Sequence, residues 1–70
     1  MSKNDKIVIG ERIKMIRQEK KISQDRLSKL ADLSLNTIVN LETDKNANPT
    51  VDTVLKISKA LGVDINRLLK

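Results

Sequence analysis

Two asparagines placed four residues apart, Asn36 and Asn40, have the spacing in this sequence that most suggests a chemical role. Residues four apart share one face of a helix, so both carboxamides would point the same way. Each carboxamide has two hydrogen-bond donors and an acceptor, which match the N6 and N7 groups of adenine in the major groove of DNA. Exposed Asn is also ordinary polar surface, so this role depends on the elements that position the pair.

Composition excludes most catalytic and metal chemistry. The 70 residues include no Cys and no His, which excludes a disulfide framework, a thiol nucleophile, an imidazole base and an ordinary zinc site. The longest apolar run, Ile7-Val8-Ile9, is far shorter than the roughly 20 residues of a membrane span. We expect one small cytoplasmic domain that is not an enzyme and has no cofactor, metal or membrane partner. Four of the nine carboxylates are scattered over expected caps, turns and a helix junction: Asp25, Glu42, Asp44 and Asp52.

The net charge of +5 favours a polyanionic partner, although many small proteins are basic for solubility alone. Residues 1–22 carry +4, residues 23–44 carry −2, and residues 45–70 carry +3. The segment that contains both asparagines is therefore acidic, and the positive charge flanks it. This pattern fits flanks that contact phosphates around a centre that reads bases, and it also fits solvated faces that simply carry the charge.

Capping residues and breakers divide the chain into five helical segments, and the aliphatic composition favours an all-α fold. We expect helices over residues 9–20, 24–31, 35–43, 51–61 and 65–70. Ser23, Ser34 and Thr50 have the positions of N-caps, and Gly62 has that of a C-terminal glycine. Residues 1–6 are expected to form a flexible tail, whose two lysines are a candidate arm along DNA.

Helical spacing separates an expected core from the outer faces. In the segment 35–43, a count of about 100° per residue puts Ile38 and Leu41 toward the core. The same count puts Asn36, Asn40 and Thr43 on the opposite face. Gly10 slightly weakens the start of the first helix. The other expected core positions are Ile9, Ile13, Ile16, Leu27, Ser28, Ala31, Val51, Val54, Ile57, Ser58, Leu61 and Leu68.

The ordered motifs of this chain, from Ile9 to Leu69, resemble the phage-repressor type of helix-turn-helix domain, the Cro and lambda-repressor-like or XRE family. The resemblance implies a compact five-helix bundle over residues 7–70, in which the segments 24–31 and 35–43 form the helix-turn-helix. The motifs that carry it are Gln24-x-x-Leu27, Ala31-x-Leu33-Ser34-x-x-Thr37-Ile38-x-x-Leu41-Glu42, Asn48-Pro49-Thr50 and Leu55-x-Ile57-x-x-Ala60-Leu61-Gly62-Val63.

Four positions depart from the family pattern. Asp32 and Asp44 stand where the family usually has Gly, at turns expected to require a left-handed backbone that Asp tolerates at some cost. Ser28 and Ser58 stand where the family usually has Ala. Ser28 fits a tight helix crossing if its hydroxyl bonds back to a carbonyl of its own helix.

By resemblance to the family, base contacts are expected from Leu35, Asn36 and Asn40. Leu35 offers no hydrogen bond but can pack on a thymine methyl group. The helix expected over 35–43 contains no Arg or Lys, so the usual bidentate contact to guanine is missing. We therefore expect an A·T-biased half-site. The resemblance also implies a phosphate contact from Gln24, which would brace this helix. The other candidates for phosphate contacts are Thr37, Thr43, Lys45, Asn46 and Asn48.

The family joins the positions of Arg17 and Glu42 by an ion pair. Glu42 lies beside the core face in the angle count, so a buried carboxylate there would need such a partner. The family also implies a homodimer, with a patch near the C-terminal helix. Its apolar candidates are Val63, Ile65 and Leu69, which could instead close the core of the monomer.

The resemblance implies a sequence-specific double-stranded DNA-binding transcriptional regulator, repressor-like, that binds a two-fold symmetric operator as a homodimer. The helix over 35–43 would lie in the major groove, with half-sites about 34 Å apart. An antitoxin of the same fold, with a toxin as partner, or a restriction-system controller is an alternative. A protein-interaction module that kept the fold without DNA binding is another, which the lack of basic residues in 35–43 supports.

Overall fold

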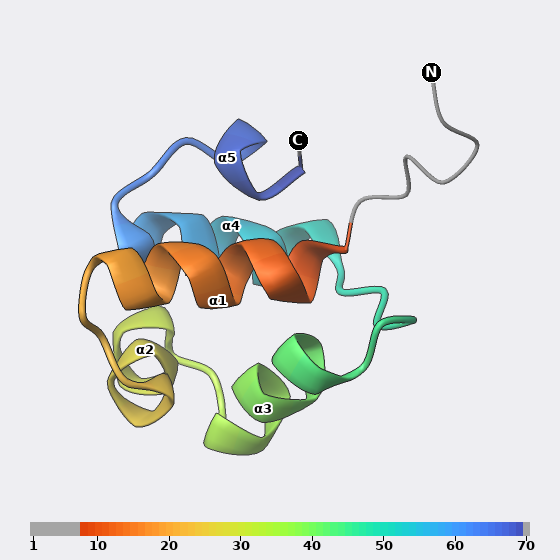
Figure 1. Cartoon of the computed structure of the whole chain (residues 1–70), viewed down its shortest axis with the longest axis horizontal. Helices are drawn as coiled ribbons and strands as arrows, with labels where there is room; N and C mark the ends of the chain where they lie inside the picture. Colours follow the sequence, from red (N-terminus) through yellow and green to blue (C-terminus); the bar gives the residue numbers. More distant parts are fainter. Residues whose placement is uncertain (1–7, 70) are drawn as a thin grey trace.

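The computed structural model describes residues 8–69 of the chain. Over this range the chain forms five helices and no strand (Figure 1). They are α1 (Ile9–Glu19), α2 (Gln24–Ala31), α3 (Leu35–Thr43), α4 (Val51–Leu61) and α5 (Asn66–Leu69). The prediction of an all-α five-helix bundle is confirmed, whereas the tail predicted over residues 1–6 lies outside the described residues.

Local capping residues determine where the helices begin. The side chains of Ser23, Ser34 and Thr50 each accept the backbone N–H three residues further on, over 3.0, 3.1 and 3.2 Å. These bonds satisfy N–H groups that have no partner in the first helical turn. Helix α4 ends at Gly62, whose φ of 68° is left-handed. All four predicted caps are therefore confirmed.

The turns differ in part from the prediction. Asp32 is left-handed, with φ 57°, as expected for the turn between α2 and α3. The left-handed turn predicted at Asp44 is wrong, because this residue is extended, with φ −93° and ψ 107°. Its carboxylate instead accepts the backbone N–H of Asn46 over 2.9 Å, which forms the bend without a left-handed residue. Lys21 is an unpredicted left-handed residue, with φ 58°.

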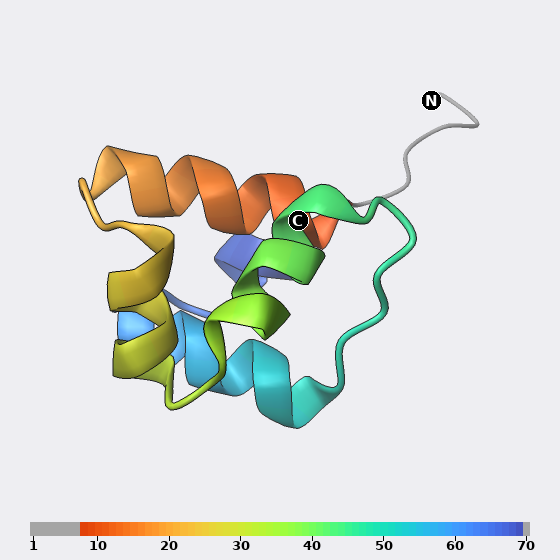
Figure 2. The same cartoon turned by 90° about the horizontal axis from the view of Figure 1, so that it is seen from below.

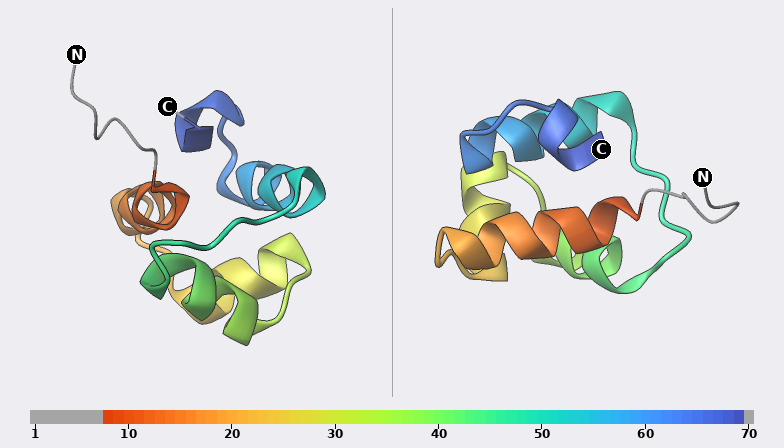
Figure 3. Two further views of the ribbon diagram at one scale, coloured as in Figure 1. Left: turned by 90° about the vertical axis from the view of Figure 1, so that its right-hand side faces the viewer. Right: turned by 45° about the horizontal axis from the view of Figure 1, so that its top comes forward.

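The helices form three layers. Helices α1 and α4 lie side by side in the middle layer, α5 lies on one side of them, and α2 and α3 lie on the other (Figures 1 and 3). Helix α3 packs on α1 and α2, and α2 also packs on α4. None of these helices, within residues 8–69, is long and apolar enough to cross a membrane. The arrangement leaves one side of the helix pair α2 and α3 uncovered (Figure 2).

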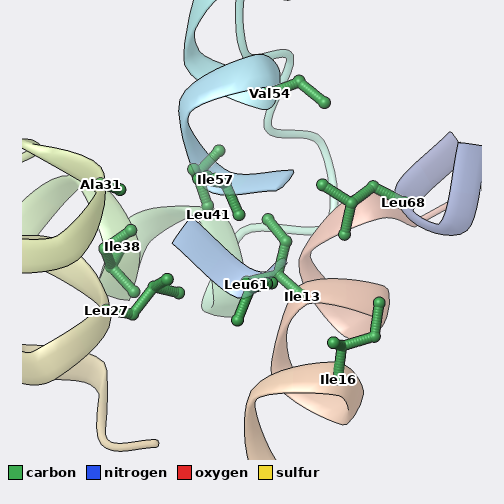
Figure 4. Close-up of a cluster of buried hydrophobic side chains, with 10 residues drawn as sticks. All are labelled: Ile13, Ile16, Leu27, Ala31, Ile38, Leu41, Val54, Ile57, Leu61 and Leu68. Carbon is green, nitrogen blue, oxygen red and sulfur yellow. The ribbon is translucent and has the colours of Figure 1, made fainter. Parts of the chain in front are cut away.

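Aliphatic side chains from all five helices converge on a single core (Figure 4). The core prediction is wrong at Val51, which is 71% exposed. Val51 is the first residue of α4 and its side chain stays outside the core, whereas Val54, one turn later, is buried. The buried aliphatic residues are Ile13, Ile16, Leu27, Ala31, Ile38, Leu41, Val54, Ile57, Leu61 and Leu68.

Small residues allow the helices to pack closely. Ser28 and Ser58 are buried, and their hydroxyls donate to the carbonyls of Asp25 and Leu55 over 2.6 and 2.9 Å. These bonds, predicted for Ser28, satisfy both hydroxyls within their own helices. Gly10 has a stronger constraint that the sequence did not reveal. A Cβ atom there would overlap the carbonyl oxygen of Leu41, so α1 and α3 approach backbone to backbone.

Gly10→Ala should lower the free energy of unfolding by about 1–3 kcal/mol, because the added methyl group must force α1 and α3 apart. At an uncrowded helical site the same change would stabilise the protein by up to about 1 kcal/mol, so the sign of the effect is decisive. Chemical denaturation followed by circular dichroism measures it. Met15→Ala, at a position of α1 that is 45% exposed, is the control and should change stability by less than about 0.5 kcal/mol. A stabilised Gly10→Ala variant would contradict the close approach.

Candidate nucleic-acid interface

Helix α3 separates its buried and exposed residues as the angle count predicts. Ile38 and Leu41 are buried in the core, whereas Asn36 and Asn40 are exposed. Leu35 is 43% exposed at the first position of the helix. The three predicted base-contacting residues therefore lie together on the surface of one helix.

Val39 also belongs to this surface, although the sequence reasoning left it unassigned. It is partly buried. At about 100° per residue it lies about 40° from Leu35, between that residue and Asn36. The angle count that identified the asparagines could have found it, but an aliphatic residue carries no polar signal. The outer surface of α3 is thus partly apolar.

A short turn joins α3 to α2 and fixes the angle between them. The backbone N–H of Leu33 donates to the carbonyl of Ser28 over 2.9 Å, and Asp32 provides the left-handed residue. Leu33 itself packs against the core. The two helices lie nearest the viewer in Figure 2, with α3 crossing in front of the bundle. This is a helix-turn-helix whose second helix is open to a ligand.

A buried ion pair connects α3 to α1. Arg17 binds both carboxylate oxygens of Glu42, with Nε at 2.8 Å from Oε2 and Nη2 at 3.0 Å from Oε1. The Glu42 side chain is 2% exposed and the Arg17 side chain 11%. The Arg17 Nη1 also donates to the carbonyl of Ile22 over 2.8 Å. The paired, bidentate geometry offsets the cost of burying both charges.

Gln24 extends this network to α2. Its Nε2 donates to Glu42 Oε1 over 3.0 Å, so the carboxylate has partners from both α1 and α2. Gln24 is the first residue of α2 and is partly buried. The Nε2 group has two hydrogens, so one remains for a second acceptor. Gln24 thus lies where it can brace α3 and still donate to an anion outside.

The two threonines proposed as phosphate contacts already form hydrogen bonds within α3 and its cap. Thr43 Oγ1 donates to the carbonyl of Val39 over 2.8 Å. The hydroxyls of Thr37 and Ser34 lie 2.8 Å apart, so one of them donates its proton to the other. A phosphate oxygen accepts hydrogen bonds, so Thr43 would have to release its internal bond to contact one. Thr37 and Ser34 retain one hydroxyl proton for this purpose.

The remaining phosphate candidates lie on the segment between α3 and α4. Lys45, Asn46 and Asn48 are all exposed there. The backbone N–H of Asn46 is held by the Asp44 carboxylate, which shapes the bend directly after α3. These side chains therefore follow the C-terminal end of the helix that carries the asparagines.

The residues proposed for a dimer interface divide between core and surface. Val63 and Ile65 are partly buried and pack against the core, whereas Leu69 is 40% exposed. Leu69 borders an apolar groove of about 300 Å³, which is formed by residues of α1, α4, the C-terminal region and the segment between α3 and α4. That segment faces the viewer in the left view of Figure 3. Val51 also lines this groove, and the sequence reasoning missed it by placing it in the core. The complete lining is Ile9, Ala47, Asn48, Pro49, Val51, Val54, Ile65 and Leu69.

A model of the helix-turn-helix domain family matches residues 10–70. The chain belongs to this family, of the phage-repressor or XRE type. It is 33% identical to the immunity repressor protein of Bacillus phage phi105 over 63 residues, which cover 90% of this chain and 43% of that protein. It is 36% identical to the control protein C.BamHI of Bacillus amyloliquefaciens over 70 residues, which cover 99% of this chain and 85% of that protein.

A solved structure has the same fold. The master regulator for biofilm formation SinR, in complex with DNA, superimposes with a TM-score of 0.83 at 32% identity, over 89% of this chain and 98% of that one. The full SinR protein of Bacillus subtilis is longer, and the chain spans 56% of its length. The chain thus spans about half the length of the phage repressor and SinR. The predicted assignment to the helix-turn-helix family of the phage-repressor or XRE type is confirmed.

Glu42→Ala should lower the free energy of unfolding by about 3–5 kcal/mol, because it leaves the Arg17 guanidinium buried without its counter-ion. Thermal or chemical denaturation measures the loss. Glu19→Ala is a matched control, since Glu19 pairs with Arg67 over 3.4 Å in an exposed bridge and should lose less than about 1 kcal/mol. A loss below about 0.5 kcal/mol for Glu42→Ala would contradict a structural role of the buried pair.

Proposed function

We propose that this domain is the DNA-binding module of a repressor-like transcriptional regulator, which inserts α3 into the major groove of a specific operator. The observation that carries the proposal is the exposed surface of α3, with Leu35, Asn36 and Asn40, which Glu42 holds against α1 and α2. A helix fixed in this way presents the same side chains to every DNA site. Such a regulator acts where the DNA lies, in the cytoplasm.

The contacts divide into those that read bases and those that position the helix. Asn36 and Asn40 would bind adenine edges, and Leu35 would pack beside them. Gln24 would donate its second amide hydrogen to a phosphate. The other proposed phosphate contacts are Thr37, Thr43, Lys45, Asn46 and Asn48. Lys45 is the only cation among them. These contacts therefore add only about 0.9 to the slope of the logarithm of the binding constant against the logarithm of the salt concentration.

A second copy of the chain would supply the second half-site. One helix reads only a few base pairs, and two-fold pairing places a second α3 about 34 Å away. We propose that Leu69 and Val51, both exposed beside the apolar groove, pack against the same groove of the partner, with Ile65 beneath them. Val63 lies outside the groove lining and would be at most a peripheral contact.

A restriction-system controller is a second candidate within the same chemistry. Its support is the similarity to the restriction-modification controller protein C.AhdI of Aeromonas hydrophila, with a TM-score of 0.81 at 26% identity over 89% of this chain and 92% of that one. The similarity to the control protein C.BamHI also extends over 85% of that protein, compared with 43% of the phage repressor. Both candidates require sequence-specific binding of double-stranded DNA. They differ in which promoter contains the operator.

Selection from a random duplex library, with affinity then followed against salt concentration, tests the proposed function. We expect a two-fold symmetric motif with A·T pairs under each α3. Asn36→Ala and Asn40→Ala should each weaken binding of this motif by about 5- to 150-fold, the value of one bidentate base contact. Asn66→Ala, at an exposed position of α5, is the control and should bind normally.

Weak binding with a steep salt dependence and no selected motif would contradict the proposal. It would indicate a generic basic surface, and a protein-interaction module would then be the better description. A motif made of G·C pairs in the contacted steps would retain DNA binding but contradict the roles of Asn36 and Asn40.

Leu69→Glu should convert the dimer to a monomer, because it places a charge in the apolar groove. Sedimentation measures the oligomeric state, and affinity for the two-fold motif should fall in parallel. Met15→Glu is the matched control, since Met15 is an exposed apolar residue of α1 that does not line the groove. A Leu69→Glu protein that still forms dimers would place the interface elsewhere.

A further inference from the structure

The outer surface of α3 has two chemically different sides. Leu35 and Val39 form an apolar side, which we name the aliphatic strip, and Asn36 and Asn40 form an amide side. At about 100° per residue, the centres of the two sides are separated by about 100° around the helix axis. Leu35 is 43% exposed and Val39 is partly buried, so both contribute apolar surface next to exposed amides.

This division matches the major-groove edge of an A·T pair. Adenine presents its N7 acceptor and N6 donor, and thymine on the opposite strand presents O4 and the C5-methyl group. A carboxamide satisfies both adenine groups, whereas an aliphatic side chain favours the methyl group. An A·T pair therefore offers a polar edge and an apolar edge to the same helix.

Alternative targets of α3 fit less well. Guanine is read by Arg or Lys through N7 and O6, and residues 35–43 contain neither. Cytosine presents an amino donor, which an Asp or Glu carboxylate typically accepts. The acidic residue of α3 is Glu42, whose carboxylate is buried and occupied by Arg17 and Gln24. Residues 35–43 thus have no Arg, no Lys and no unoccupied carboxylate with which to select a G·C pair.

We propose that the aliphatic strip contacts thymine methyl groups, so that α3 reads the orientation of A·T pairs as well as their presence. Adenine lies on the strand that faces Asn36 and Asn40, and thymine lies on the strand that faces Leu35 and Val39. Val39 thereby becomes a specificity-determining residue. This inference rests on the proposed function, because it requires that α3 occupies the major groove.

Replacing thymine by deoxyuridine in the selected operator tests the inference without altering the protein. Uracil keeps O4 and its pairing with adenine but lacks the C5-methyl group. Replacing a thymine that contacts the aliphatic strip should lower the affinity of the protein for the operator about fourfold, because the burial of one methyl group is lost. Thymines outside the contacted steps should show no change. Inverting a contacted A·T pair should cost about tenfold or more, because it displaces the amide contact as well.

Protein variants then assign the lost affinity to particular side chains. In Leu35→Ala or Val39→Ala, the ratio of affinities for thymine and uracil operators should fall toward one at the step that the residue contacts. In Asn36→Ala, overall affinity should fall while this ratio is retained. Leu30→Ala, at an exposed leucine of α2, is the matched control and should also retain the ratio.

The outcomes separate this inference from the proposed function. If a two-fold motif is selected but uracil replaces every contacted thymine without loss, the inference is wrong and DNA binding stands. If the thymine preference persists in both aliphatic variants, another residue reads the methyl group and the inference is also wrong. If no motif is selected, both the inference and the proposed function fail.

Discussion

The buried carboxylate of Glu42 is the interaction on which the presentation of α3 depends. Its two oxygens bind Arg17 of α1, and one of them also accepts from Gln24 of α2, so three helices meet at one group. A hydrophobic contact would hold these helices together but would leave their rotation less defined. The bidentate pair and the backbone contact at Gly10 fix α3 in both position and angle. The exposed side chains of α3 are therefore held at a defined place on the surface of the protein.

The same arrangement explains why α3 can have an unusual composition. Ile38, Leu41 and Glu42 hold the inner side of α3, so its outer side needs no role in folding. That side carries amides and aliphatics without a cation, and the positive charge lies in the flanking segments. In the proposed function, the amides and aliphatic residues of α3 would discriminate among bases, and the positive charge of the flanking segments would add affinity for phosphates. The aliphatic strip is compatible with a solvent-exposed surface because it is short and lies beside polar residues.

The sequence predicts those features that depend on local chemistry. Ser23, Ser34 and Thr50 cap their helices through bonds to residues three positions away, and the helical angle count separates Ile38 and Leu41 from the asparagines. The Arg17–Glu42 pair was inferred from resemblance to a family, because residues far apart in sequence give no local signal.

Features that depend on tertiary packing were missed. In the sequence, Gly10 only weakens a helix, because its close packing against α3 gives no local signal. Val51 continues the apolar stripe of its helix, but its side chain lies outside the core. The Asp44 turn was misread because a side-chain bond to Asn46 replaces the left-handed backbone.

The central claim is that α3, held by Glu42, is the surface that meets DNA. Nuclear magnetic resonance of the isotope-labelled protein, titrated with the selected operator duplex, tests this claim most directly. We expect the largest chemical-shift changes in the backbone of α3, in the side-chain amides of Asn36 and Asn40, and at the start of α2 near Gln24. Helix α5 lies on the opposite side of the bundle, so its outer residues should change little (Figure 1). The largest changes on α5 and the outer face of α1, with the α3 amides unaffected, would contradict the account.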